Sequence, residues 1–233
     1  MAELRIIDHE AFEVKRANSD QESMWDGFRF GVPNKYAGYM TDFLTYATGE
    51  WTVTETQAGA TQALSDGILG KLLLTNSAAD NDIVGLQLVS ESFMPTAGKN
   101  IYFEIKFQTN LAEQIDWVAG LCKLQNTLPT TACTDGVYFR KDDGDAYIDC
   151  VATDTSVTSA EVAMATQLDA TNVVLGLRVV GNDHVDFWIN GVKKCTLKTV
   201  IPTEELSLTF AMANGEAVAK TATIDYICAY QER

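Results

Sequence analysis

The chain has 233 residues, 46% of them hydrophobic, which is enough to bury one sizeable core. Its formal net charge is -15 at pH 7, and an acidic surface repels phosphate backbones, so we expect no nucleic-acid partner. No run approaches the roughly 20 apolar residues of a membrane span, and the first residues lack the pattern of a secretory signal. We therefore expect a protein made in a cytoplasm, with no membrane partner.

Residues 1–40 differ in composition from the rest and predict an irregular N-terminal arm. Ser19 to Glu22 match a helix capping box, which predicts a short helix from Asp20 toward Gly27. Beyond it, five aromatic residues are interleaved with glycines and a proline, which disfavour a long helix or strand. These rings either fold back over their own chain or bind a partner, since aromatic side chains dominate interface energetics. The candidate partner-binding residues are Trp25, Phe28, Phe30, Tyr36 and Tyr39.

Residues 41–233 predict a single antiparallel all-β domain, because short β-branched and aromatic runs alternate with polar turns. Tyr102, Glu104 and Lys106 alternate with apolar residues, as in a strand with one buried face. The runs are numerous enough for two packed sheets, so we predict a β-sandwich. The expected strands are 42–47, 51–55, 72–75, 83–89, 100–107, 117–121, 136–140, 146–151, 173–180, 185–189, 192–197, 206–210 and 223–230.

Asn190-Gly191 predicts a two-residue type I′ turn between two of these strands. With regular pairing the turn would place Phe187 opposite Lys194 and mix an apolar and a charged side chain on one face. Either a bulge shifts the register after the turn, or the hairpin is partly exposed to solvent.

The stretch from Val173 to Tyr230 resembles the concanavalin A-like, laminin-G-like jelly rolls. It contains a strand, a polar turn, the run Val-Asp-Phe-Trp-Ile-Asn-Gly, another strand, a proline-containing loop and two closing strands. The resemblance implies a jelly roll. Lectins, glucanases, lyases and virion proteins share that fold, so the resemblance does not choose a function.

The catalytic motifs expected of sandwich enzymes are missing from the sequence. A retaining glucanase needs Glu-x-Asp-x-Glu or Glu-x-Asp-x-x-Glu on one strand, but Glu104 has a lysine as its same-face neighbour, and Glu113 and Asp116 have no third partner. A polysaccharide lyase needs a proton-abstracting His or Tyr, and the two histidines are His9 in the arm and His184 in a turn. We therefore predict that the protein is not an enzyme and has neither catalytic residues nor a cofactor.

Two acidic turns bring hard oxygen ligands together, as calcium requires, but neither has EF-hand spacing, and Asp is also an ordinary turn former. We therefore predict no metal site, with these weak calcium candidates: Asp80, Asp82, Asp142, Asp143 and Asp145. The five cysteines are scattered singly, which argues against a disulfide framework and a zinc site and predicts free, buried thiols.

Motifs between Trp51 and Lys106 resemble tailed-bacteriophage virion proteins of the jelly-roll type. They include Trp51-Thr-Val-Thr, a Gly-Ile-Leu-Gly-Lys-Leu-Leu-Leu run and Lys-Asn-Ile-Tyr-Phe-Glu-Ile-Lys106. The resemblance implies a non-enzymatic capsid decoration (cement) protein on the phage head, made in the host cytoplasm and bound to the major capsid protein. It also implies a homo-oligomer, with a trimer favoured. The alternative is a carbohydrate-binding, lectin-like module of a virion surface or tail fibre, with Trp188 as the candidate sugar-contacting residue.

Overall fold

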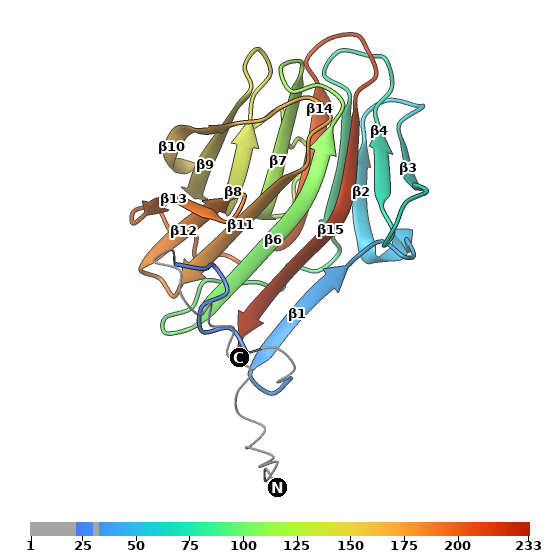
Figure 1. The fold of residues 1–233 in the computed structure, drawn as a ribbon. Coiled ribbons are helices and arrows are strands. Elements are labelled where there is room, and N and C mark those ends of the chain that lie inside the picture. The colour runs from blue at the N-terminus through green and yellow to red at the C-terminus, as the bar shows by residue number, and fades with distance from the viewer. Residues whose placement is uncertain (1–21, 30–32) are drawn as a thin grey trace, which may run out of the picture.

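The computed structural model describes residues 22–29 and 33–233, which form two antiparallel sheets packed face to face (Figure 1). The predicted all-β, two-sheet sandwich is confirmed. The one helix in these residues is the short 3-10 helix η1 (Thr48–Glu50). Within the same residues, no helix has the length and apolar character needed to cross a membrane.

The front sheet, nearest the viewer in Figure 1, has eight strands. The long strand β15 pairs with β6 along one edge, while β4 and β1 share its other edge. In order, the front sheet contains β13 (Val192–Leu197), β12 (His184–Ile189), β11 (Val173–Val180), β6 (Asn100–Thr109), β15 (Thr221–Glu232), β4 (Leu72–Thr75) and β3 (Thr61–Leu64), with β1 (Tyr36–Thr41) beside β15.

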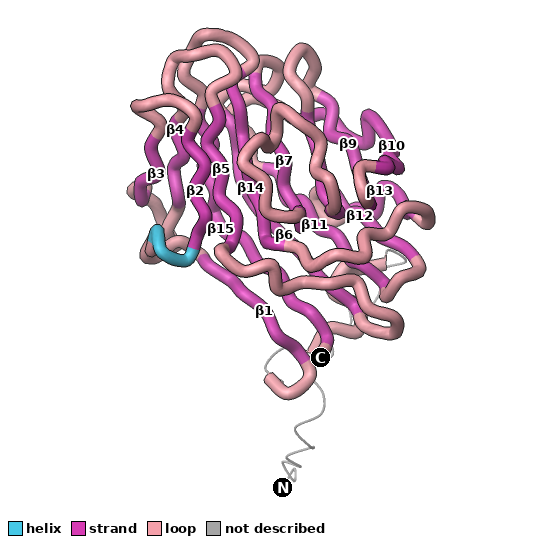
Figure 2. Tube along the Cα trace, turned by 180° about the vertical axis from the view of Figure 1, so that it is seen from behind, coloured by secondary structure: helices cyan, strands magenta, loops and turns pink. Residues whose placement is uncertain are grey.

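The back sheet has seven strands and faces the viewer in Figure 2. All its pairs are antiparallel, as short turn-linked strands allow. In order, the back sheet contains β10 (Val157–Thr166), β9 (Tyr147–Asp154), β8 (Gly136–Lys141), β7 (Ile115–Cys122), β14 (Ser207–Asn214), β5 (Ile83–Leu88) and β2 (Trp51–Glu55).

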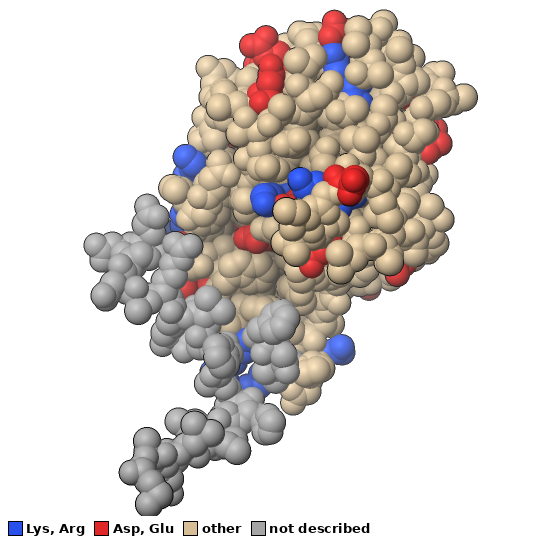
Figure 3. All heavy atoms as spheres, turned by 45° about the vertical axis from the view of Figure 1, so that its right-hand side comes forward, with Lys and Arg blue, Asp and Glu red and all other residues tan. Residues whose placement is uncertain are grey.

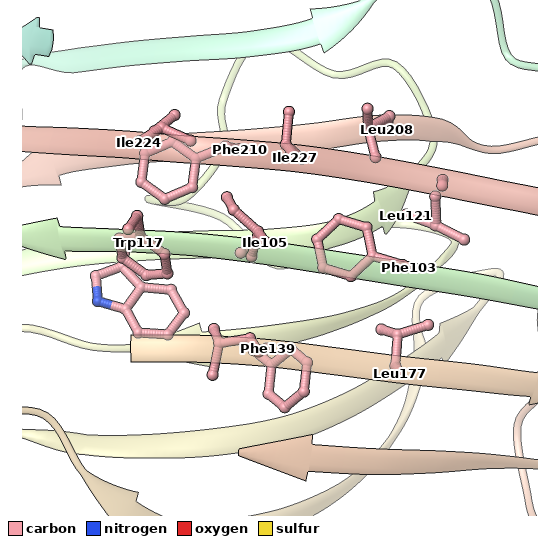
Figure 4. Close-up of a cluster of buried hydrophobic side chains, with 14 of the residues drawn as sticks. Phe103, Ile105, Trp117, Leu121, Phe139, Leu177, Leu208, Phe210, Ile224 and Ile227 are labelled. Carbon is pink, nitrogen blue, oxygen red and sulfur yellow. The ribbon is translucent and has the colours of Figure 1, made fainter. Parts of the chain in front are cut away.

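The main core lies between the sheets, where alternate residues of both point inward (Figure 4). Phe107 packs edge-on against Trp117 and Phe210, with ring centroids 5.1 and 5.0 Å away. The Trp117 indole N–H donates to the Gln167 side chain at 2.7 Å, so the buried ring keeps its hydrogen bond. The other side chains of each strand, which alternate with the core residues, therefore point to the outer faces of the sandwich.

A second apolar cluster covers part of the back sheet's outer face. It is built from strand residues and from the loop of residues 123–135. Tyr138 is fully buried in it, between Cys122 and Val151 of neighbouring strands and Leu128 of the loop. This loop therefore shields that part of the back sheet from solvent.

Three strands were not predicted from the sequence, and one predicted strand is absent. The unpredicted strands are β1, β3 and β10, whereas residues 42–47 form bends and loop instead of a strand. Glycine in the middle of β1 had suggested irregular backbone, but Gly38 is required there. A Cβ at Gly38 would lie 2.2 Å from a ring carbon of Tyr230, so only glycine lets the two strands pair.

The Asn190-Gly191 turn is confirmed, and a β-bulge sets the register after it. Ile189 pairs with Val192, but the register shifts next, so that Cys195 lies opposite Phe187 and the intervening lysine is unpaired in the ladder. The bulge is therefore confirmed, and the hairpin is also partly exposed, since Val192 and the unpaired lysine face solvent.

Candidate functional site

Residues 22–28, which we call the strap, lie against the outer face of the front sheet (Figure 1). Residues 24–27 form a turn in place of the predicted helix, and the Phe28 N–H donates to the Trp25 carbonyl at 3.0 Å. Buried Met24 lies over Gly176 of β11, where a Cβ would come within 2.5 Å of the Met24 sulfur. A glycine inside a strand thus makes room for the strap.

Glu104 of β6 is the central acid of this face. Its carboxylate oxygens accept hydrogen bonds from the Trp25 indole N–H at 3.2 Å and from the Tyr226 hydroxyl at 2.8 Å. Burial raises the pKa of Glu104 and outweighs these two hydrogen bonds, which lower it. Burial and the nearby Glu104 carboxylate also raise the pKa of Tyr226, so its hydroxyl keeps the proton that it donates.

Two cavities of about 430 and 460 Å³ open on this face, and both are lined by Trp25 and Glu104. The first lies over β11 and β12, where the strand register aligns Glu104, Gly176 and Trp188 in one row. The second lies on the other side of β6, over β15 and β1, and is mostly apolar apart from Glu104 and Asp42. Together they form a groove across the front sheet that the strap crosses at Trp25.

Aromatic rings form much of the surface around the groove. Trp25 stacks on Tyr102, with ring centroids 5.8 Å apart and planes 10° from parallel. Phe28 packs against Tyr36, Tyr102 and Tyr230, with centroids between 4.7 and 5.2 Å away. Apolar and aromatic walls with a few fixed polar groups are the usual composition of a small-ligand site.

A network of ion pairs lies at the β12 end of the groove. Asp186 is almost fully buried and accepts from Arg178 and Lys193, each at 2.9 Å. Burial raises the pKa of Asp186, but hydrogen bonds led by the one from Thr196 outweigh it, so the pKa is lowered. Both cations also lie over the Trp188 ring, 5.3 and 5.4 Å from its centroid.

The acidic charge of the protein is not gathered into one patch on the face in Figure 3. Asp and Glu side chains there lie in separate small groups, several of them beside Lys or Arg. The net charge of -15 therefore does not by itself mark a binding surface on that face.

The structure places four of the five predicted partner-binding aromatics on their own sandwich. Trp25 and Phe28 belong to the strap, while Tyr36 and Tyr39 belong to β1, so the last residues of the predicted arm are part of the front sheet. The Tyr39 hydroxyl donates to Glu50 at 2.9 Å. Phe30 lies outside the described residues. Binding of these aromatics to a partner chain stays a prediction.

The calcium candidates are mostly engaged in local hydrogen bonds or ion pairs. Asp82 is buried and accepts from the Thr56 hydroxyl at 2.8 Å and the Ser77 N–H at 2.6 Å, and Asp145 accepts from the Tyr147 N–H at 2.8 Å. In residues 22–29 and 33–233, no three His, Cys, Asp or Glu side chains gather as metal ligands. Of the other candidates, Asp142 pairs with Arg140, Asp143 lies against Gly215, and Asp80 is in a turn.

The residues considered for catalysis lie on different faces. Asp116 is on the outer face of the back sheet, where burial raises its pKa and the Asp143 N–H donates to it at 2.7 Å. Glu113 precedes β7, and His9 lies outside the described residues. His184 was expected in a solvated turn, but it begins β12 and its ring nitrogen Nδ1 lies 2.6 Å from Asp183.

Trp188, the candidate sugar-contacting residue, lies on the outer sheet face under the strap. Its side chain is buried, and its indole N–H donates to the Glu22 carbonyl at 3.0 Å. The sequence pattern did not single out three residues of the site, Tyr226, Arg178 and Lys193. The signal that could have found them is the polar and aromatic side chains at alternate positions of otherwise apolar strands.

No protein-family model matches the chain, and no curated protein matches its sequence. Several solved structures match its fold. An endo-1,3-β-glucanase from Streptomyces sioyaensis superposes with a TM-score of 0.61 at 12% identity, over 86% of this chain and 98% of that one. An endo-β-1,4-glucuronan lyase from Trichoderma reesei gives 0.56 at 9%, over 82% and 94%. The carbohydrate recognition domain of Emp46p gives 0.53 at 11%, over 78% and 88%.

The chain has a concanavalin A-like jelly-roll fold. The identities are so low that these similarities establish the fold alone. The compared proteins act on or recognise carbohydrates, and none of the three bears on a phage origin or a capsid role.

These comparisons correct the prediction that the chain is not an enzyme, because glucanases and a lyase share its fold. The prediction was wrong in treating a missing glucanase motif and the lack of a suitable lyase histidine as evidence against any catalysis. Glu104 had been set aside because Lys106 is its same-face neighbour. The structure instead pairs Lys106 with Asp225 at 2.6 Å and leaves Glu104 with a raised pKa.

Proposed function

We propose that the protein binds a carbohydrate chain in the groove across the outer face of the front sheet. The observation that supports this most is the pair of cavities that share Glu104 and Trp25, the second of which is also lined by Tyr226 and Tyr230. Each cavity is within the range of about 300–1,000 Å³ that small-ligand sites occupy. The fold likeness to carbohydrate-active and carbohydrate-recognising proteins points in the same direction.

The groove offers the two kinds of contact that a sugar needs. Ring faces of Tyr230 and Trp25 can pack against the apolar C–H side of a pyranose, while the Glu104 carboxyl and the Tyr226 hydroxyl can bond its hydroxyl groups. Because these polar groups already bond to one another, a ligand has a preorganised set of partners.

The test is a panel of β-glucans and β-glucuronan measured by affinity electrophoresis with the wild-type protein and two variants. Tyr230→Ala removes a ring from the groove, and we expect binding to weaken about fivefold or more because such a contact is worth roughly 1 kcal/mol or more. Tyr147→Ala is the matched control, since this half-exposed tyrosine lies on the back sheet. Binding that both variants weaken equally would contradict the groove, and no binding to any polysaccharide would contradict the function.

A second function, cleavage of glycosidic bonds, is favoured by two carboxyl groups in one cavity. Glu104 and Asp42 both line the 460 Å³ cavity, and glycoside hydrolysis commonly uses such a pair. The raised pKa of Glu104 suits a general acid, which must hold its proton near neutral pH. Release of reducing ends should then stop in Glu104→Gln and continue in Asp116→Asn, the equivalent change at a half-buried back-sheet acid whose pKa is also raised.

The capsid decoration role implied by the phage resemblance stays a prediction. It depends on partners that the fold does not specify, namely the major capsid protein and further copies of this chain. Electron microscopy of an intact particle that carries this chain would test it directly.

A further inference from the structure

Glu22, the first residue of the strap, has a carboxylate that is bound by two cations, as the carboxylate of a ligand would be. Glu22 pairs with Arg178 and, at 2.8 Å, with Lys193, while its carbonyl accepts the Trp188 indole N–H at 3.0 Å. The Lys193 hydrogen bond is the main reason that the pKa of Glu22 is lowered. Glu22 belongs to no strand, and its side chain is 43% exposed, so these polar contacts hold it in place without any strand pairing.

The cations around Glu22 belong to the sheet and need a second anion. Asp186 neutralises one of the two charges of Arg178 and Lys193, and Glu22 neutralises the other. If Glu22 leaves, two sheet-borne cations face one carboxylate, and the site gains a net positive charge inside a protein of charge -15. His184 lies near the same aspartate, with Nε2 3.5 Å from it, and adds no further anion.

The site is continuous with the groove. Glu22 lines the 430 Å³ cavity together with Trp188 and Glu104. Arg178 and Lys193 contact Glu22, so a sugar in that cavity that displaced Glu22 would meet a pair of cations at one end and a carboxyl group at the other. Arginine binds carboxylates through a planar fork of donors, and lysine adds a point charge.

We propose that Arg178 and Lys193 form a subsite for the carboxylate of a uronic acid residue, and that Glu22 occupies this subsite when no ligand is present. The proposal rests on the proposed carbohydrate-binding function and names its substrate class, an acidic polysaccharide. The ligand displaces Glu22 from the two cations and takes its place, while Asp186 keeps its own bonds.

The competition between Glu22 and the ligand should be measurable but modest. Ion pairs with exposed partners change an equilibrium constant by up to about fivefold. Removing the Glu22 charge should therefore strengthen uronate binding by up to about fivefold. Removing the Lys193 charge in the same variant, where Glu22 no longer competes for that cation, should weaken it by a similar factor. Neither change should affect a neutral sugar.

The experiment is isothermal titration calorimetry of the full chain with two matched probes, a β-1,4-glucuronan tetrasaccharide and cellotetraose, which lacks the carboxylates. The variants are Glu22→Gln, the double variant Glu22→Gln/Lys193→Gln and the control Glu22→Gln/Lys194→Gln, which changes an exposed lysine one residue away at the bulge. We leave Arg178 intact, because its loss would deprive buried Asp186 of a partner.

The expected result is tighter glucuronan binding by Glu22→Gln than by the wild type, weaker binding when Lys193→Gln is added to it and no change when Lys194→Gln is added, with cellotetraose unaffected throughout. Equal effects on both sugars, or none on glucuronan, would overturn the carboxylate subsite. Binding of cellotetraose without glucuronan would overturn the subsite and leave the proposed function standing. Failure of every polysaccharide to bind would overturn both.

Discussion

The strap provides the sharpest test of how the groove is built, through the substitution Phe28→Ala. Phe28 is only 5% exposed and touches Trp25, Tyr102 and Tyr230, so its ring links the strap to two strands of the front sheet. Truncating a buried Phe to Ala costs about 3–5 kcal/mol, and we take about 3 because water can fill part of a surface site. In a domain of this size that cost lowers the melting temperature by about 6–12 °C.

The assay is thermal unfolding followed by circular dichroism, with Leu44→Ala as the control. Leu44 is 72% exposed, so its truncation should change stability by no more than about 0.5 kcal/mol. A melting temperature for Phe28→Ala within about 2 °C of the wild-type value would refute the reasoning. It would mean that the strap separates from the sheet before the sandwich unfolds, as an arm that anchors the protein to a partner would.

Three further predictions concern the rest of the fold. Burial raises the pKa of Glu104 above its value in the unfolded chain. The stability that Glu104 contributes is therefore present at low pH and is lost as the pH rises through the folded pKa. Between about pH 4 and 8, the melting temperature should fall less for Glu104→Gln than for the wild type. Gly120→Ala should lower the free energy of unfolding in urea by about 1–3 kcal/mol, because its Cβ would lie 2.4 Å from the Val137 carbonyl oxygen. Gly176→Ala should lower it less, because the atom nearest to its Cβ belongs to the flexible Met24 side chain. The four buried cysteines should react with a thiol reagent only after denaturation, since burial disfavours the reactive thiolate, as in the raised pKa of Cys228.

The sequence pattern predicts strands well where one face is buried. Residues 100–107 alternate cleanly, and β6 occupies Asn100–Thr109. The pattern is weak in β10, an edge strand with mostly exposed residues, so Val157–Thr166 carries almost no apolar alternation. In β1 the pairing with β15 decides the conformation, and the local sequence does not. Gly38 lies inside the strand because a residue without a Cβ lets β15 come close enough to pair.

The site was less predictable because its parts come from distant segments. Glu104 bonds to Trp25, 79 residues earlier, and to Tyr226, 122 residues later. A same-face neighbour along one strand, here Lys106, is a poor guide to what a side chain contacts, since a bulge in β15 brings Asp225 to Lys106 instead. Only the sheet order makes Glu104 the centre of a groove.

The two outer faces of the sandwich differ in a way that decides where a ligand can bind. The back sheet carries a loop whose apolar side chains fill the space over Tyr138 and Val151, leaving that area dry. The strap covers the front sheet with a turn of a few residues, and it leaves a cavity on each side of β6. Its polar contacts, from Glu22 and Trp25, are with groups that a sugar acid could also use. A cover that fills a face with apolar side chains stabilises the fold alone, whereas the strap combines a few buried side chains with exchangeable polar contacts, and those polar contacts are where a ligand could replace it.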